Sequence, residues 1–83
     1  MGELDWVLRK NDVQVLDQRV IKGGDRVTYV IKIPATHSKV LPEIRRVLRR
    51  VLNEKSYFVI NRSNGTITLK VHLRGLPRKR RAF

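Results

Sequence analysis

The sequence contains no cysteine and few acidic residues, and none of its apolar runs is long. Without cysteine, disulfide bonds and thiolate metal ligands are excluded, and nothing indicates an oxidising compartment. No apolar run approaches the ~20 residues needed to span a bilayer, and the first residues lack the regions of a secretory signal. We therefore expect a cytoplasmic, or more broadly intracellular, protein. Scarce methionine and a preference for arginine over lysine mildly favour a heat-adapted source.

The shortage of acidic residues leaves the chain strongly basic. Nineteen Lys and Arg residues stand against seven Asp and Glu residues, which gives a net charge of +12 over 83 residues. A hydrophobic content of 41% is too high for a disordered basic tail, so we expect one folded domain with a single core. Because charge of one sign repels itself, a polyanionic partner stabilises such a chain. Nucleic acid is the first candidate, and an anionic membrane surface is the second.

The strongest pattern in the sequence is an amphipathic helix at residues 40–52. At about 100° per residue, one arc of this helix is entirely apolar. The arc consists of Val40, Leu41, Ile44, Val47, Leu48, Val51 and Leu52. Outside the arc lie four arginines, Arg45, Arg46, Arg49 and Arg50. Pro42 fits only in the first turn, because deeper in the helix it would remove a hydrogen bond. We expect Thr36 or Ser38 to cap this helix.

One β-hairpin is predicted before this helix. Residues 13–22 and 26–33 are rich in β-branched side chains, the Gly23-Gly24 pair is the expected turn, and Pro34 ends the second strand. Alternation then divides the side chains between two faces. The more polar face holds Arg19, Arg26, Thr28, Val30 and Lys32. The apolar face holds Leu16, Val20, Val27, Tyr29, Ile31 and Ile33.

A second hairpin is predicted after the helix, with Asn64 and Gly65 as its two-residue turn. In this register Ser63 faces Thr66, and Tyr57 faces His72. The core face then holds Phe58, Ile60, Leu69 and Val71, which we expect to pack against Ile44, Val47, Leu48 and Val51. The opposite face holds Tyr57, Val59, Asn61, Thr68, Lys70 and His72.

The order of elements predicts an α+β fold. Residues 3–10 form a short opening helix with Leu4, Val7 and Leu8 facing inward. The order (short α)-β-β-α-β-β gives a four-stranded antiparallel sheet with one long amphipathic helix packed on one face. We expect a single domain over residues 1–75 and an extended basic tail over residues 76–83.

Three sets of residues are candidates for binding nucleic acid. The first is the arginine face of the helix, since arginine contacts phosphate with a planar fork of donors. The second is the basic run in the tail, Arg78, Lys79, Arg80 and Arg81. The third is the outward sheet face, with Tyr57, Lys70, His72, Arg19, Arg26 and Lys32. The alternatives are that the arginines form a solvated helix exterior, and that the opening helix or a second subunit covers Tyr57 and Val59.

Nothing in the sequence indicates catalysis. The acidic residues are scattered, whereas a two-metal nuclease needs acids clustered about a shared site. No serine is paired with a base in a recognisable pattern, and Gly23-Gly24 lacks the lysine and the spacing of a phosphate loop. We therefore expect no enzyme activity, no cofactor and no metal site.

The sequence therefore predicts a non-catalytic nucleic-acid-binding protein that contacts the phosphate backbone through the Arg-faced helix and the basic tail. RNA is slightly favoured over DNA, because an open sheet with a tyrosine suits unpaired bases. The nearest alternative is a chromatin-like or viral DNA-binding protein. An alternative of another class is a dimeric protein-interaction module, or an adaptor or inhibitor, whose charge meets an acidic protein. A strongly apolar second sheet face would favour this alternative, because an uncovered apolar patch marks an interface. Membrane binding is not expected, because the helix has no exposed apolar margin.

Overall fold

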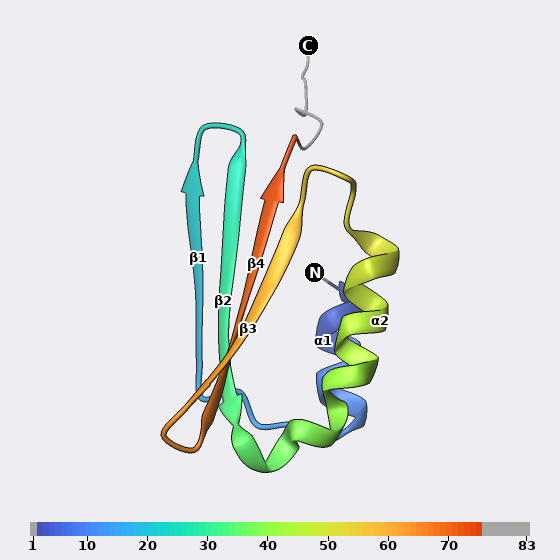
Figure 1. The fold of residues 1–83 in the computed structure, drawn as a ribbon, viewed down its shortest axis with the longest axis vertical. Coiled ribbons are helices and arrows are strands. Elements are labelled where there is room, and N and C mark those ends of the chain that lie inside the picture. The colour runs from blue at the N-terminus through green and yellow to red at the C-terminus, as the bar shows by residue number, and fades with distance from the viewer. Residues whose placement is uncertain (1, 76–83) are drawn as a thin grey trace.

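Two helices cover one face of a four-stranded antiparallel sheet, and the described residues leave the other face open (Figure 1). This computed structural model describes residues 2–75. In chain order its elements are α1 (Gly2–Lys10), β1 (Asp17–Gly23), β2 (Arg26–Pro34), the 3-10 helix η1 (Ala35–Val40), α2 (Leu41–Val51), β3 (Tyr57–Ser63) and β4 (Thr66–Arg74). The predicted α+β fold and element order are confirmed.

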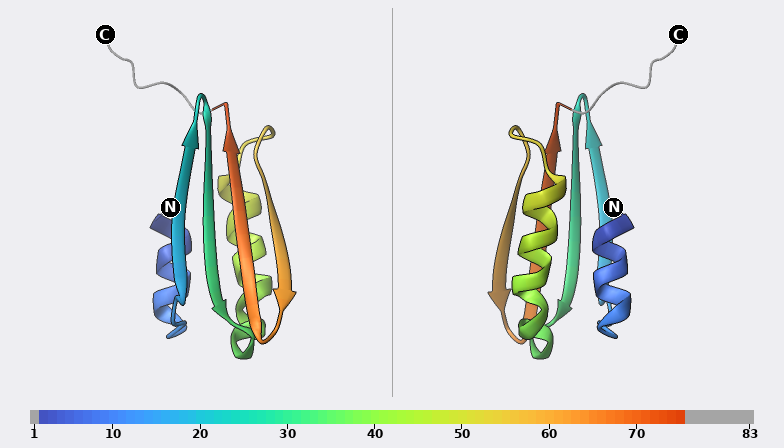
Figure 2. Two further views of the ribbon diagram at one scale, coloured as in Figure 1. Left: turned by 90° about the vertical axis from the view of Figure 1, so that its left-hand side faces the viewer. Right: turned by 90° about the vertical axis from the view of Figure 1, so that its right-hand side faces the viewer.

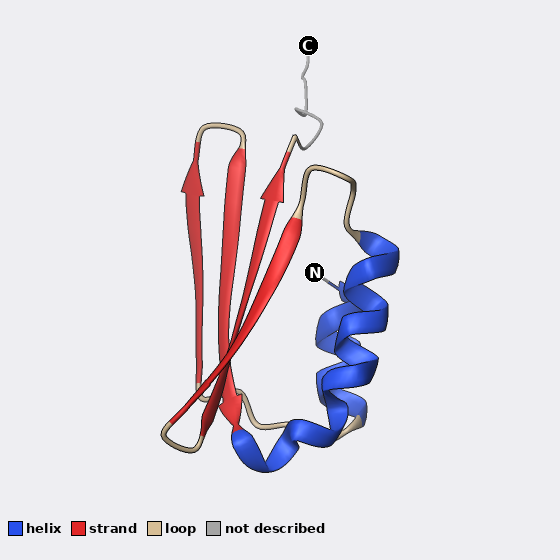
Figure 3. Cartoon of the chain, viewed as in Figure 1, coloured by secondary structure: helices blue, strands red, loops and turns tan. Residues whose placement is uncertain are grey.

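The sheet order is β1-β2-β4-β3, and every neighbouring pair of strands is antiparallel. Between β2 and β3 the chain passes through η1 and α2, so the second hairpin returns with β4 beside β2 (Figure 3). The central strands are therefore β2 and β4. In Figure 2, α1 lies over the β1 and β2 side of the sheet and α2 over the β4 and β3 side.

The second hairpin has the predicted register. Ser63 pairs with Thr66, and Tyr57 pairs with His72. Asn64 and Gly65 form the turn with positive φ angles of 49° and 80°, as a type I′ turn requires. On the core face Leu69 and Val71 are buried, whereas Phe58 and Ile60 are partly buried because β3 is an edge strand.

The first hairpin turns one residue later than the sequence predicts. Gly23 pairs with Arg26, so the turn consists of Gly24 and Asp25 rather than Gly23 and Gly24. Gly24 has a φ of 58° and takes the first central position, where glycine is favoured in a type II′ turn. The pairing partner of each β1 residue moves by two positions along β2, so both faces keep the predicted side chains.

The chain before β1 is also not a strand over its predicted length, since β1 begins only at Asp17. Residues 11–13 instead end α1: the N–H of Val13 donates to the carbonyl of Leu8, and that of Asp12 to Arg9. Asp12 has a positive φ of 54°, and together these features form a Schellman motif. Val13 then enters the core.

The core lies between the sheet and the two helices. Leu4, Val7 and Leu8 of α1 are buried as predicted, and so are Ile44, Val47 and Leu48 of α2. The prediction for Val51 was wrong, since this side chain is 40% exposed. The helix ends at Val51 and the backbone of Leu52 is extended, so Leu52 packs against the end of the core instead.

The predicted side-chain cap of the long helix was also wrong. Thr36 and Ser38 lie within η1. The N-cap residues are Pro34 for η1 and Val40 for α2, and no side-chain cap hydrogen bond is made at either position. The N–H of Leu41 donates to the carbonyl of Ser38, so the preceding 3-10 turn satisfies a donor that a capping side chain would otherwise accept. Pro42 lies in the first turn, as predicted.

Candidate nucleic-acid interface

The open face of the sheet contains five cross-strand rows, which follow from the strand register and the alternation of side chains, and the last of them, at the β3–β4 turn, consists of Pro34, Thr66 and Ser63. We call this surface the open face. From the end of the β1–β2 turn, the first two rows are Gly23, Arg26 and Arg74, then Ile21, Thr28, His72 and Tyr57. The next two rows are Arg19, Val30, Lys70 and Val59, then Asp17, Lys32, Thr68 and Asn61.

The open face is positively charged. It holds Arg19, Arg26, Lys32, Lys70 and Arg74, against a single carboxylate from Asp17. That carboxylate accepts a hydrogen bond from the Nε of Arg19 at 3.2 Å, so it neutralises one of the five cations. The structure therefore brings together all six residues that the sequence predicts for this face.

Two aromatic rings lie side by side in the second row. The ring centroids of Tyr57 and His72 are 4.6 Å apart with an interplanar angle of 28°, so the rings are stacked. Nδ1 of His72 is also hydrogen-bonded to Oγ1 of Thr28 at 3.2 Å. Tyr57 is 51% exposed and Val59 is 38% exposed. The alternative that the opening helix covers them is wrong, since α1 packs on the opposite face (Figure 2).

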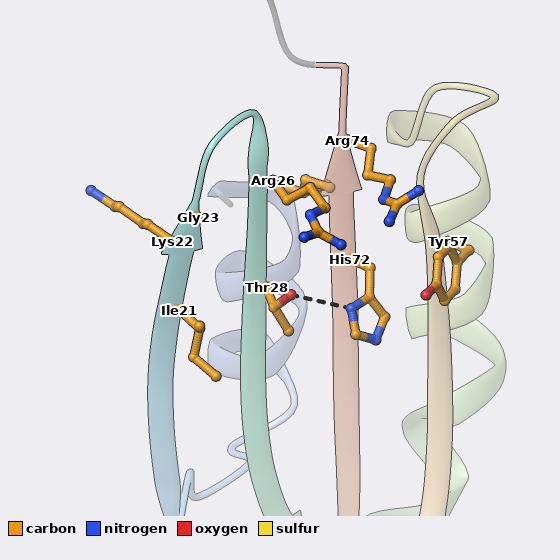
Figure 4. A pocket seen from close by; sticks show the side chains of 9 residues that line it. Ile21, Lys22, Gly23, Arg26, Thr28, Tyr57, His72 and Arg74 are labelled. Atoms are coloured by element: carbon orange, nitrogen blue, oxygen red, sulfur yellow. Dashed lines mark hydrogen bonds between the residues drawn. The ribbon is translucent and has the colours of Figure 1, made fainter.

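A hollow of about 170 Å³ lies between the first two rows. Arg26 and Arg74 are partners in the β2–β4 register. Their guanidinium groups lie between the His72 ring and the end of the sheet, at the top of the view in Figure 4. The side chain of Lys22 points away from this group of residues (Figure 4). No carboxylate lines the hollow, and neither arginine is within ion-pair distance of an acidic side chain in the described part of the chain.

Arg74 is a residue of this face that sequence reasoning missed. The sequence pattern could have predicted it, because Lys70, His72 and Arg74 are alternate residues of one strand and therefore share a face. The loop between α2 and β3 holds its backbone on both sides. Ser56 Oγ accepts from the N–H of Arg74, and the Asn53 amide donates to its carbonyl, each at 3.1 Å. The backbone of Arg74 is therefore held in place, although Arg74 is the last residue of β4.

The arginine face of α2 forms a second basic surface. Arg45, Arg46 and Arg49 are exposed, and with Pro42 they line a shallow depression. None of these three has an ion-pair partner within 4.0 Å among residues 2–75. Arg50 differs, because its guanidinium pairs with Glu3 of α1. The four predicted arginines thus fall into three that have no ion-pair partner in the described part of the chain and one that connects the helices.

Glu43 also connects the two helices. Its carboxylate pairs with Lys10 Nζ at 2.5 Å and accepts a hydrogen bond from the Asn11 amide at 3.2 Å. The hydrogen bond from Lys10 is the largest cause that lowers the pKa of Glu43 below its ordinary value of 4.5, and the charge of Arg46 acts in the same direction. Lys10 Nζ also lies 4.4 Å from the centroid of the Trp6 ring. The acid next to the arginine face is therefore already engaged with α1.

The two basic surfaces lie on opposite sides of the molecule. α2 packs on the covered face of the sheet, and its arginines lie off the buried stripe, so they point away from the open face (Figure 2). One short straight segment of a ligand cannot contact both surfaces. The remaining predicted site residues, Arg78, Lys79, Arg80 and Arg81, lie outside the described residues.

The described residues form neither a metal cluster nor a helix that could span a membrane. Residues 2–75 contain no group of three or more His, Asp or Glu side chains placed to hold a metal ion. Within the same residues, no helix has the length and apolar character that crossing a membrane requires. Comparison with models of known families, with curated proteins and with solved structures found no match.

Proposed function

We propose that this protein is a non-catalytic nucleic-acid-binding module whose open face binds a single strand, with RNA favoured over DNA. The observation that carries the proposal is an exposed, stacked Tyr57 between two rows of cationic side chains on an uncovered sheet. Unpaired bases stack on aromatic rings, and arginine and lysine bind the phosphates between them. An open sheet offers both contacts to a strand that lies across it.

The chemistry of the face favours backbone recognition over sequence recognition. Phosphate contacts fix the position of a strand and carry no sequence information. One exposed aromatic residue provides one stacking site, which accepts any base because every base has a π face. We therefore expect weak base preference and a strong dependence of affinity on salt.

The arginine face of α2 is proposed as a second contact with the phosphate backbone. Arg45, Arg46 and Arg49 are the residues with free guanidinium groups in the described part of this helix. Their position on the opposite side from the open face suits a second segment of the same strand, or a strand that bends around the module. The basic tail from Arg78 to Arg81 is a further proposed contact.

Two other functions are weighed against this proposal. Duplex DNA binding is favoured by α2 alone, since a helix with an arginine face can contact a duplex backbone. A dimer through the second sheet face requires a strongly apolar surface. The apolar residues of the open face, Ile21, Val30 and Val59, are interspersed with cations, so this condition is not met.

Fluorescence anisotropy with labelled single-stranded RNA, single-stranded DNA and duplex DNA of one sequence tests the proposal. We expect the tightest binding to RNA, with log K falling by about 0.7 per phosphate contact for each unit of log salt. Tyr57→Leu should weaken binding of single strands by about 1 to 3 kcal/mol. Trp6→Leu is the matched control, because Trp6 is also an exposed aromatic residue but lies on α1, away from the open face.

Two results would contradict the proposal. Equal affinities for duplex and single strands, unchanged in Tyr57→Leu, would remove the open face from the binding surface. Failure to bind any of the three nucleic acids in low salt would exclude nucleic-acid binding altogether.

A further inference from the structure

The hollow at the end of the open face has more hydrogen-bond donors than an internal phosphate needs. Arg26 and Arg74 present two guanidinium groups to the same space, and each can donate two parallel hydrogen bonds to an oxyanion. Nδ1 of His72 is hydrogen-bonded to Oγ1 of Thr28, which holds the imidazole ring beside this space. Tyr57 also lines the hollow. The ligand that fits these donors is a compact oxyanion with several acceptor oxygens.

A terminal phosphate has this chemistry. A phosphomonoester carries a charge of about −1.5 to −2 at neutral pH and three strong acceptor oxygens, whereas a phosphodiester within a strand has one charge and two such oxygens. Among residues 2–75 no carboxylate lines the hollow, so none of these residues offsets the two guanidinium charges there. We propose that the hollow binds the terminal phosphomonoester of the strand on the open face, an inference that rests on the function proposed above.

The hollow is also rigidly built, although it lies at the end of the sheet. Arg26 is held in register on both sides, by Gly23 of β1 and by Arg74 of β4. The backbone of Arg74 is held further by Asn53 and Ser56. Because both arginines start from fixed backbone positions, less conformational freedom is lost when they bind an anion.

The position of the hollow matches the rest of the open face. Successive rows on one side of a sheet are about 6.6 Å apart, since each residue rises about 3.3 Å. A phosphate between Arg26 and Arg74 therefore leaves the adjoining sugar and base near Tyr57 in the next row. The strand then continues towards Lys70 and Lys32, whose charges suit internal phosphates. The strand end lies at the hollow, and the chain runs along the face from there.

The test compares three forms of one short oligoribonucleotide: with a 5′-phosphate, with a 3′-phosphate, and with hydroxyls at both ends. We expect one phosphorylated form to bind the full chain about tenfold more tightly than the unphosphorylated form. The form that gains affinity identifies which end lies in the hollow. Equal affinities of all three forms overturn this inference and leave the proposed function intact. If none of the three binds, the proposed function fails as well.

Paired variants locate the effect. Arg26→Gln combined with Arg74→Gln should reduce the tenfold preference to about one, whereas Lys32→Gln combined with Lys70→Gln should weaken all forms and keep the preference. The control pair lies on the same two strands and removes the same charge, outside the hollow. A preference that persists in the first pair overturns the inference.

If that pair of variants fails to fold, NMR titration of the wild-type chain with inorganic phosphate tests the same site. Chemical-shift changes at Arg26, His72 and Arg74 that are larger than those at Lys32 and Thr68 support binding in the hollow. Uniform chemical-shift changes overturn the inference.

Discussion

The hydroxyl of Ser56 accepts a hydrogen bond from the backbone N–H of Arg74 at 3.1 Å. The amide of Asn53 donates to the carbonyl of the same residue, also at 3.1 Å. The turn between α2 and β3 therefore holds the end of β4, and with it the backbone of one arginine of the hollow. Two residues that carry no charge thus fix the position of a charged one.

Replacing Ser56 with alanine should loosen this end of β4. The hydrogen bonds removed involve exposed groups, so we expect a decrease of about 0.5 to 1.5 kcal/mol in the free energy of unfolding, measured by urea denaturation. Amide hydrogen exchange at Arg74 should become faster, and the preference for a terminal phosphate should decrease. Ser63→Ala is the control, because the Ser63 hydroxyl makes no hydrogen bond within the described structure. Equal exchange rates at Arg74 in both variants would show that the Ser56 hydrogen bond is not needed.

The two hairpins differ in how far their sequences determine them. Asn64 and Gly65 favour one turn, so the second register could be predicted residue by residue. The first hairpin has Gly23, Gly24 and Asp25 in a row, which allows two adjacent two-residue turns. Both turns place the same side chains on the same faces, so alternation of polar and apolar residues cannot distinguish them.

The candidate site could be predicted only in part for a similar reason. Alternation along single strands places Arg19, Lys70 and His72 on the outward face. The hollow depends on Arg26 lying opposite Arg74, a pairing between strands far apart in the sequence. Local pattern does not fix such a pairing, because it depends on where α2 returns the chain to the sheet.

The free arginines of α2 should contribute to binding through charge. Replacing Arg45, Arg46 and Arg49 together with glutamine should weaken binding to all sequences and reduce the slope of log K against log salt by about 0.7 to 0.9 for each phosphate that is no longer bound. The fold should survive, since these residues lie outside the buried stripe. Arg50→Gln alone should change the slope less, because Glu3 already neutralises Arg50. An unchanged slope in the folded triple variant would exclude α2 from the binding surface.

The ion pair between Glu43 and Lys10 should make stability depend on pH in the acid range. Because the pKa of Glu43 lies below 4.5 in the folded protein, its carboxylate stabilises the fold above about pH 4.5, and this contribution is lost as pH falls through the lowered pKa. Glu43→Gln should therefore be less stable than wild type in urea denaturation at pH 7, and the difference should shrink towards pH 3.

A matched variant separates this effect from the loss of a negative charge. Glu54 is exposed and has no ion-pair partner in the described structure, so Glu54→Gln changes the net charge equally. We expect little difference between Glu54→Gln and wild type at any pH in the series. A constant gap between Glu43→Gln and wild type from pH 7 to pH 3 would contradict the assigned role of the carboxylate.

Deletion of residues 78–83 should reduce affinity without destabilising the domain. The deletion removes Arg78, Lys79, Arg80 and Arg81, so the salt slope should decrease by about 0.7 to 0.9 for each phosphate that the tail binds, with four phosphates as the upper limit. The melting temperature should stay nearly constant or rise slightly, because four like charges are removed from a chain of net charge +12. A truncated chain with an unchanged slope would show that the tail does not contact nucleic acid, and a large fall in melting temperature would show that it contributes to the fold.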